Sequence, residues 1–114
     1  MITLYGIPNC DTVKKARAWL AAAGIAHHFH DLRKDGLTGE RLDSWLASAG
    51  WEALLNRKGT TFRALDDADK ADLDTAKARA LMLANPAMIK RPVVEFGDAV
   101  LVGFQPDRWA GLLR

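Results

Sequence analysis

Residues 2–32 read ITLYGIPNCDTVKKARAWLAAAGIAHHFHDL, and this stretch decides the fold. Residues 2–7 alternate in hydrophobic character and are rich in β-branched and aromatic side chains. This pattern predicts a strand that ends at Pro8. Beyond it, apolar residues follow helical spacing as far as Gly24, and residues 26–32 predict a second strand. A strand, a helix and a strand over this length predict a βαβ unit with parallel strands.

A block of helices is expected in the middle of the chain. Thr38 is placed to cap a helix that Gly50 ends, and residues 51–55 predict a short helical segment. A longer helix is expected from about residue 73 to residue 84. The residues expected to face inward on this last helix are Ala76, Ala80, Leu81 and Leu83.

The end of the chain returns to β-structure. Residues 93–96 and 99–102 predict a hairpin with a two-residue turn, and residues 105–113 predict an amphipathic helix. The order βαβ, helices, ββα is the thioredoxin-like layout, an α/β fold with a four-stranded mixed sheet covered by helices. We therefore expect a single thioredoxin-like domain over residues 1–114, with a helical insertion at about residues 34–88.

Composition limits the possible functions. A chain of 114 residues that is 49% hydrophobic has the length of one folded domain. Its net charge of +2 is too balanced to indicate direct nucleic-acid binding. The sequence has neither a secretory signal pattern nor a long apolar span, so we expect a cytoplasmic protein without a membrane partner.

Cys10 is the only cysteine and lies between the first strand and the first helix. The unpaired N–H groups of a first helical turn favour a thiolate there, and Lys14 and Lys15 add positive charge. The alternative is an inert cysteine that serves as a small apolar residue. Val13 occupies the third position after Cys10, so there is no Cys-x-x-Cys pair. Redox chemistry at Cys10 would therefore need a thiol from another molecule.

Two clusters of residues could suggest a metal site, but for each we prefer an interpretation without a metal. His28 and His30 share one face of their strand and His27 takes the other, with no nearby carboxylate, so we expect surface histidines. An aspartate-rich stretch lacks the central glycine and distal glutamate of a calcium loop, so we expect a solvated helix start. Its members are Asp66, Asp67, Asp69, Asp72 and Asp74. No metal and no bound cofactor are expected.

Three segments together carry a family resemblance. They are YGIPNCDT at residues 5–12, LLNRKG at residues 54–59 and MIKRPVV at residues 88–94. In this order and spacing, over nearly the whole chain, the sequence resembles the arsenate reductase family, which includes the Spx regulators, and it most resembles the YffB branch. The resemblance implies a thioredoxin-like reductase that works with glutathione as co-substrate and with glutaredoxin.

The resemblance also implies roles for particular residues. Cys10 would be the catalytic nucleophile, and Arg57 and Arg91 would converge on it to stabilise a thiolate or an oxyanion. Thr12 would help to hold the thiolate, and Pro92 would be a cis-proline beside the sulfur. The residues expected to contact glutathione are Asn9, Arg91, Pro92 and Val93.

Departures from the family pattern indicate which reaction is favoured. There is no third arginine in residues 102–105, Gly6 stands where a histidine is common, and Val13 and Lys14 stand where serine and arginine are expected. Each change removes an oxyanion contact or a group that stabilises the thiolate, so glutathione-dependent reduction of thiols or disulfides through a Cys10 mixed disulfide fits better.

Three alternatives remain. One is a true arsenate reductase that uses glutathione and glutaredoxin. Another is a Spx-like regulator without enzymatic activity that binds RNA polymerase. The last is a scaffold whose thiol is unused.

Overall fold

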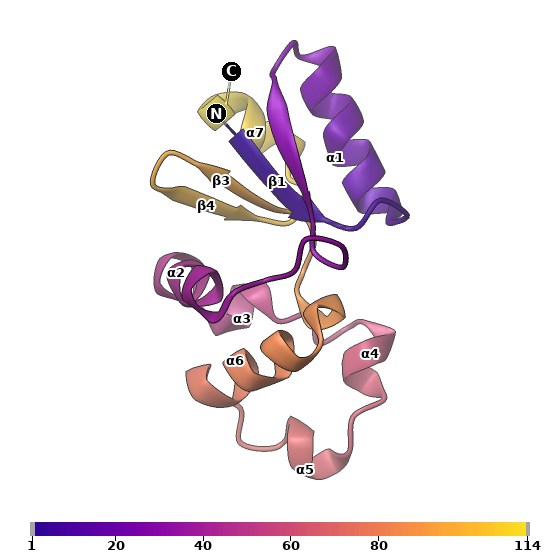
Figure 1. Cartoon of the computed structure of the whole chain (residues 1–114), viewed down its shortest axis with the longest axis vertical. Helices are drawn as coiled ribbons and strands as arrows, with labels where there is room; N and C mark the ends of the chain where they lie inside the picture. The colour runs from indigo at the N-terminus through magenta and orange to yellow at the C-terminus, as the bar shows by residue number, and fades with distance from the viewer. Residues whose placement is uncertain (1, 114) are drawn as a thin grey trace. The chain divides into compact units, whose positions relative to one another are not determined.

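The computed structural model describes residues 2–113 and contains a four-stranded sheet in the order β2-β1-β3-β4 (Figure 1). The strands are β1 (Ile2–Gly6), β2 (His27–Asp31), β3 (Val93–Phe96) and β4 (Ala99–Val102). β2 runs parallel to β1, whereas β3 is antiparallel to β1 and β4 is antiparallel to β3. The predicted mixed sheet is therefore confirmed, and the β3–β4 hairpin has the expected bounds.

Two helices cover one face of this sheet. They are α1 (Asp11–Ala22), which connects the parallel strands, and α7 (Pro106–Leu113). Both share one apolar core with the sheet, because their buried side chains cluster with alternate residues of the strands. The members of this core are Ile2, Leu4, Val13, Ala16, Leu20, Val94, Leu101 and Trp109.

Residues 37–90 form a compact helical unit, and residues 2–36 together with 91–113 form the unit that holds the sheet. The helical unit contains α2 (Gly39–Ala49), α3 (Trp51–Leu54), α4 (Thr60–Arg63), α5 (Asp67–Lys70), α6 (Thr75–Ala84) and the 3₁₀ helix η1 (Pro86–Met88). α6 contacts α2, α3 and η1 and lies at the centre of this packing. The description of the chain as one domain stays a prediction.

A short backbone pairing inside the helical unit joins the segment after α3 to the segment after η1. Leu55 forms a bridge with Ile89. On either side of this bridge, Asn56 N donates to Met88 O at 2.8 Å and Lys90 N donates to Leu54 O at 2.7 Å. The two segments are thereby fixed side by side, although more than thirty residues separate them in the chain.

The predicted inward face of α6 is wrong. Ala78 and Met82 are the buried residues of this helix, whereas Ala76 and Ala80 are exposed and Leu81 is only half-buried. Most of α6 is apolar all round, so the pattern allows more than one inward face. Packing against neighbouring helices decides which face is buried.

The short helices α4, α5 and η1 are absent from the sequence-based expectation. Each contains only three or four residues, which is too short to produce a periodic apolar pattern. Among residues 2–113, no helix has both the length and the apolar character that a membrane crossing requires.

Candidate functional site

Cys10 occupies the N-cap position of α1, as expected from its place in the sequence. Its backbone is extended, with φ −91° and ψ 125°, and its side chain makes no capping hydrogen bond. The Cys10 carbonyl accepts from Lys14 N at 2.9 Å, which starts the helix. The side chain is half-buried against the core shared by α1 and the sheet. The thiol is therefore positioned at the first turn of α1 and is not used as a cap.

Asn9 and Thr12 flank the cysteine on the exposed side of the loop and of the first helical turn. Asp11 is the acidic residue of that turn. Negative charge at a helix N-terminus is favourable, because the first-turn N–H groups have no partner within the helix. This segment therefore combines one sulfur, one hydroxyl and one amide side chain within four consecutive residues.

The peptide bond between Arg91 and Pro92 is cis, which confirms the expectation for Pro92. Pro92 is buried and its carbonyl accepts from Gly103 N at 2.8 Å. Val93 pairs with Tyr5 in the antiparallel register of β3 with β1. The start of β3 therefore lies at the end of β1 from which the chain continues to Cys10. The half-buried Arg91 and the cysteine thus lie at the same edge of the sheet.

Arg57 lies in the helical unit, in the turn that follows α3. It is exposed, and its guanidinium lies over the Trp51 ring at 5.5 Å from the centroid. The guanidinium is thus held by a cation–π contact within its own unit. The convergence of Arg57 on Cys10, which the family resemblance implies, stays a prediction.

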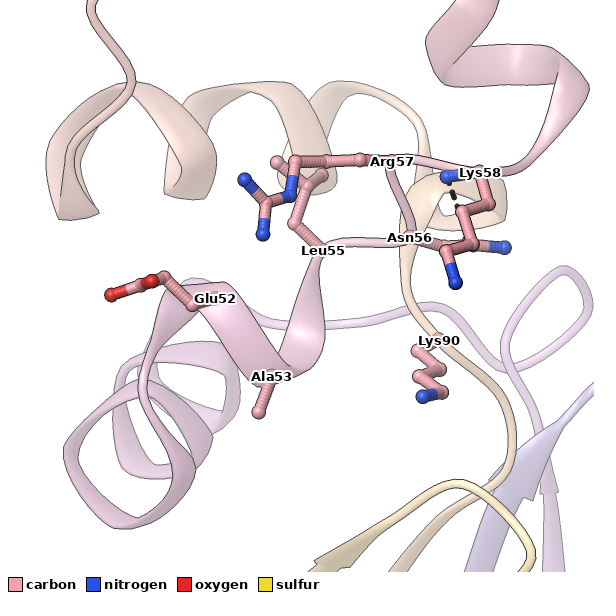
Figure 2. Close-up of a pocket in the computed structure, with 7 residues that line it drawn as sticks. All are labelled: Glu52, Ala53, Leu55, Asn56, Arg57, Lys58 and Lys90. Atoms are coloured by element: carbon pink, nitrogen blue, oxygen red, sulfur yellow. Dashed lines mark hydrogen bonds between the residues drawn. The ribbon is translucent and has the colours of Figure 1, made fainter.

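A pocket of about 250 Å³ lies beside Arg57 (Figure 2). Its lining residues all belong to the helical unit and are Glu52, Ala53, Leu55, Asn56, Arg57, Lys58 and Lys90. Sequence reasoning did not single out Lys58 and Lys90. Both lie inside the motifs that carried Arg57 and Arg91, so their adjacency to those arginines was the available signal.

Gly6 and Val13, two of the departures from the family pattern, are in contact. A Cβ atom placed on Gly6 would lie 2.6 Å from Cγ2 of Val13, closer than real Cβ atoms approach other atoms. Both residues are buried. The valine therefore fills the space that a side chain at position 6 would need. The glycine at position 6 and the valine at position 13 thus depend on each other.

His27 and His30 have partners within the protein, while His28 is exposed. Arg17 Nε lies 3.3 Å from His27 Nε2 in hydrogen-bond geometry. Burial, with the positive charge of Arg17 second, lowers the pKa of His27 below 6.5. His30 Nε2 lies 2.7 Å from the Gly36 carbonyl. These contacts give two of the histidines structural roles.

The aspartate-rich stretch includes a helix start, as expected. Asp74 caps α6 by accepting from Lys77 N at 2.8 Å. The Lys77 ammonium also donates to the Ala68 carbonyl at 2.7 Å and to the Ala71 carbonyl. An internal lysine thus supplies the positive charge in this loop. Within residues 2–113, no three metal-binding side chains are grouped.

Comparison with known proteins identifies close matches. The model of the ArsC family matches residues 5–112. A solved structure of a YffB protein is 56% identical, with a TM-score of 0.97 over the whole of both chains. An arsenate reductase (ArsC) related protein from Brucella melitensis is 50% identical, with a TM-score of 0.81 over 99% of this chain and 94% of that one. The global transcriptional regulator Spx of Streptococcus agalactiae is 30% identical over 94% of this chain and 79% of its own.

Proposed function

We propose, since the chain belongs to the ArsC family, that it is a single-cysteine reductase that acts on disulfides with glutathione as co-substrate. The family resemblance and the thioredoxin-like fold are confirmed by the family match and by the solved structures. Membership alone leaves the reaction open, because the family contains both arsenate reductase-like proteins and Spx homologues. The reaction is therefore argued from the residues around the cysteine.

The observation that carries the proposal is the position of Cys10. It occupies the N-cap position of α1, at the sheet edge where the cis Arg91–Pro92 peptide precedes β3. Within residues 2–113, neither backbone group of Arg91 takes part in a backbone hydrogen bond, while the Pro92 carbonyl is bonded to Gly103. In this proposal the Arg91 amide and carbonyl bond the backbone of a peptide such as glutathione.

The proposed reaction has three thiol–disulfide exchanges. The Cys10 thiolate attacks a substrate disulfide, forms a mixed disulfide and releases the first substrate thiolate, which takes a proton from water. A glutathione thiolate attacks the Cys10 sulfur and releases the second substrate thiolate. A second glutathione attacks the bound glutathione sulfur, so oxidised glutathione leaves and the Cys10 thiolate returns. Two electrons pass from two glutathione molecules to the substrate.

Other residues are assigned supporting roles in this proposal. Arg91 and Arg57 stabilise negative charge on sulfur, and the Thr12 hydroxyl with the first-turn amides holds the Cys10 thiolate. Asn9, Arg91, Pro92 and Val93 contact glutathione. Glutaredoxin could replace the second glutathione in the last exchange. A cytoplasmic location is part of the proposal, since reduced glutathione is kept available there.

The test is a coupled assay with bis(2-hydroxyethyl) disulfide and glutathione, in which glutathione reductase reports oxidised glutathione through NADPH consumption. We expect turnover above the uncatalysed rate for the wild type and none for Cys10→Ser. Arg91→Ala should lower the rate about tenfold or more, because a hydrogen bond to a charged group is worth roughly 1.5–3 kcal/mol. Arg33→Ala, an exposed arginine of the sheet unit, is the matched control. Equal rates for the wild type and Cys10→Ser would overturn the proposal.

Arsenate reduction is the second candidate, favoured by the similarity to the arsenate reductase (ArsC) related protein. Here arsenate would gain two electrons from two thiols, which form a disulfide, and the products would be arsenite and water. The contact between Gly6 and Val13 argues against efficient turnover, because it leaves apolar atoms where the family often has polar donors. Arsenite formation that requires Cys10, glutathione and glutaredoxin would favour this candidate over the first.

A regulator without enzymatic activity is the third candidate, favoured by the 30% identity to Spx. Binding to the RNA polymerase α subunit in a pull-down, with no turnover in the coupled assay, would favour it. The absence of a Cys-x-x-Cys pair argues against a redox switch of that kind, because Val13 stands at the second cysteine position.

A further inference from the structure

A second pocket, of about 360 Å³, lies in the sheet unit beside α1 and the start of β2. The α1 helix lines it from Val13 to Ala21, and Pro8 and His27 complete the lining. From residue 13 to residue 21 a helix rises about 12 Å, so the pocket follows the long axis of α1. The residues assigned to the proposed reaction, Cys10 among them, do not line it.

The charges that line this pocket are all positive. Lys14 and Arg17 are three positions apart, so they are neighbours on one face of α1. Within residues 2–113, neither of them forms an ion pair. His27 is neutral at pH 7, because burial and the nearby Arg17 lower its pKa below 6.5. The pocket therefore offers a ligand two cations and no carboxylate.

Arg17 is held in place by β2. Its guanidinium carbon lies 4.4 Å from the centroid of the Phe29 ring, and its Nε donates to His27 Nε2 at 3.3 Å. In the described part of the chain, no other hydrogen bond uses this guanidinium. Its two terminal amino groups are therefore available to an anion, and a guanidinium pairs with a carboxylate through two parallel hydrogen bonds.

The remainder of the lining is apolar and leaves room for an elongated molecule. Pro8, Ala18 and Ala21 are exposed, and the short alanine side chains leave the surface of α1 open beside Arg17. A water molecule occupies about 30 Å³ in the liquid, so the pocket has room for about twelve groups of that size. Mostly apolar walls with a few polar groups are typical of small-molecule sites of this volume.

We propose that this pocket binds a carboxylate with an elongated apolar body, such as a medium-chain alkyl carboxylate. The carboxylate lies between Lys14 and Arg17, and the alkyl chain lies along Ala18 and Ala21 toward His27. This site goes beyond the proposed function and does not depend on it, since Cys10 takes no part in binding.

The test is a ¹⁵N–¹H NMR titration of the full chain with octanoate. We expect saturable shifts at the amides of Lys14, Arg17, Ala18, Ala21 and His27. Lys14→Gln and Arg17→Gln should each weaken binding about two- to fivefold, the usual effect of one exposed ion pair. Lys15→Gln is the matched control, because Lys15 is exposed on the same helix but does not line the pocket, and it should leave the Kd unchanged.

Further titrations test the apolar part of the site. Ala21→Glu places a carboxylate in the pocket and should weaken octanoate binding about tenfold or more, whereas Ala22→Glu, outside the lining on the same helix, should not. Acetate and inorganic phosphate should each bind at least about tenfold more weakly than octanoate, because neither buries an alkyl chain. Shifts that do not saturate, acetate or phosphate binding as tightly as octanoate, or equal effects of a lining variant and its matched control would overturn the proposal.

Discussion

Gly6 and Val13 restrict the size of the side chain that each of the two positions can hold. The glycine ends β1, and its carbonyl accepts from Leu32 N at 2.9 Å, so its backbone is fixed on both sides. The valine is fully buried in the first turns of α1. Because Cγ2 of Val13 lies only 2.6 Å from where a Cβ at position 6 would be, the strand and the helix pack more closely than two larger residues would allow.

We predict that Gly6→Ala destabilises the protein by about 1–3 kcal/mol, the usual cost of adding a group to a packed core. The double variant Gly6→Ala/Val13→Ala should recover part of that loss, because the smaller residue at position 13 makes room. Urea unfolding of the wild type, both single variants and the double variant measures the coupling. Strictly additive effects would show that the two positions do not compete for space.

We predict that His27 makes the stability of the protein depend on pH. Burial and the nearby Arg17 hold its folded pKa below 6.5, its ordinary value, so the unfolded chain binds the proton first as the pH falls. The free energy of unfolding should therefore decrease as the pH falls through 6.5, and the decrease should be complete below the folded pKa. In thermal melts between pH 7.5 and 5, His27→Gln should show a shallower fall in Tm than the wild type, with Arg17→Gln between them. Parallel curves for His27→Gln and the wild type would contradict this assignment.

At the scale of elements, capping residues fix where the helices begin. Thr38 accepts from Arg41 N at 3.2 Å and starts α2, and Asp74 starts α6 in the same way. Each cap satisfies one of the N–H groups that a helix leaves unpaired at its N-terminus. The α1 helix differs, since its N-cap is the cysteine, whose side chain makes no such bond. The first turn of α1 is thus left without a side-chain cap.

We predict that Thr38→Ala costs about 0.5–2 kcal/mol of stability, the usual effect of removing an N-cap side chain. Thr38→Asp should keep most of the wild-type stability, because a carboxylate accepts the same hydrogen bond. Urea unfolding followed by far-UV circular dichroism measures both. An equal loss in the two variants would indicate that the side chain of Thr38 acts through packing and not through its hydrogen bond.

At the scale of the whole molecule, the chain contains two compact units, each with buried aromatic and aliphatic side chains. Trp109 belongs to the core of the sheet unit, and Trp45 is fully buried in the helical unit. The chain passes from one unit to the other after Gly36 and returns between Lys90 and Arg91. Lys90, which lines the pocket of the helical unit, and Arg91, which belongs to the sheet unit, are therefore consecutive residues of the chain with different surroundings.

The sequence by itself determined the order of the strands and of the longer helices, the mixed sheet and the position of Cys10 at a helix start. These features depend on neighbouring residues, such as the alternation before Pro8 and the apolar spacing that ends at Gly24. Local patterns of this kind survive in a single sequence because strands and helices have different apolar periods. The cis bond before Pro92 followed from the family resemblance.

Only the tertiary structure decided which side chains meet across the fold. The buried face of α6, the contact of Gly6 with Val13 and the pairing of Lys90 with Leu54 at the end of α3 each depend on packing between distant segments. No periodic pattern encodes such contacts, because the partner lies in another element and packing selects among several faces that are equally apolar. The pocket that brings Lys58 and Lys90 together is therefore a product of the folded chain and not of any one motif.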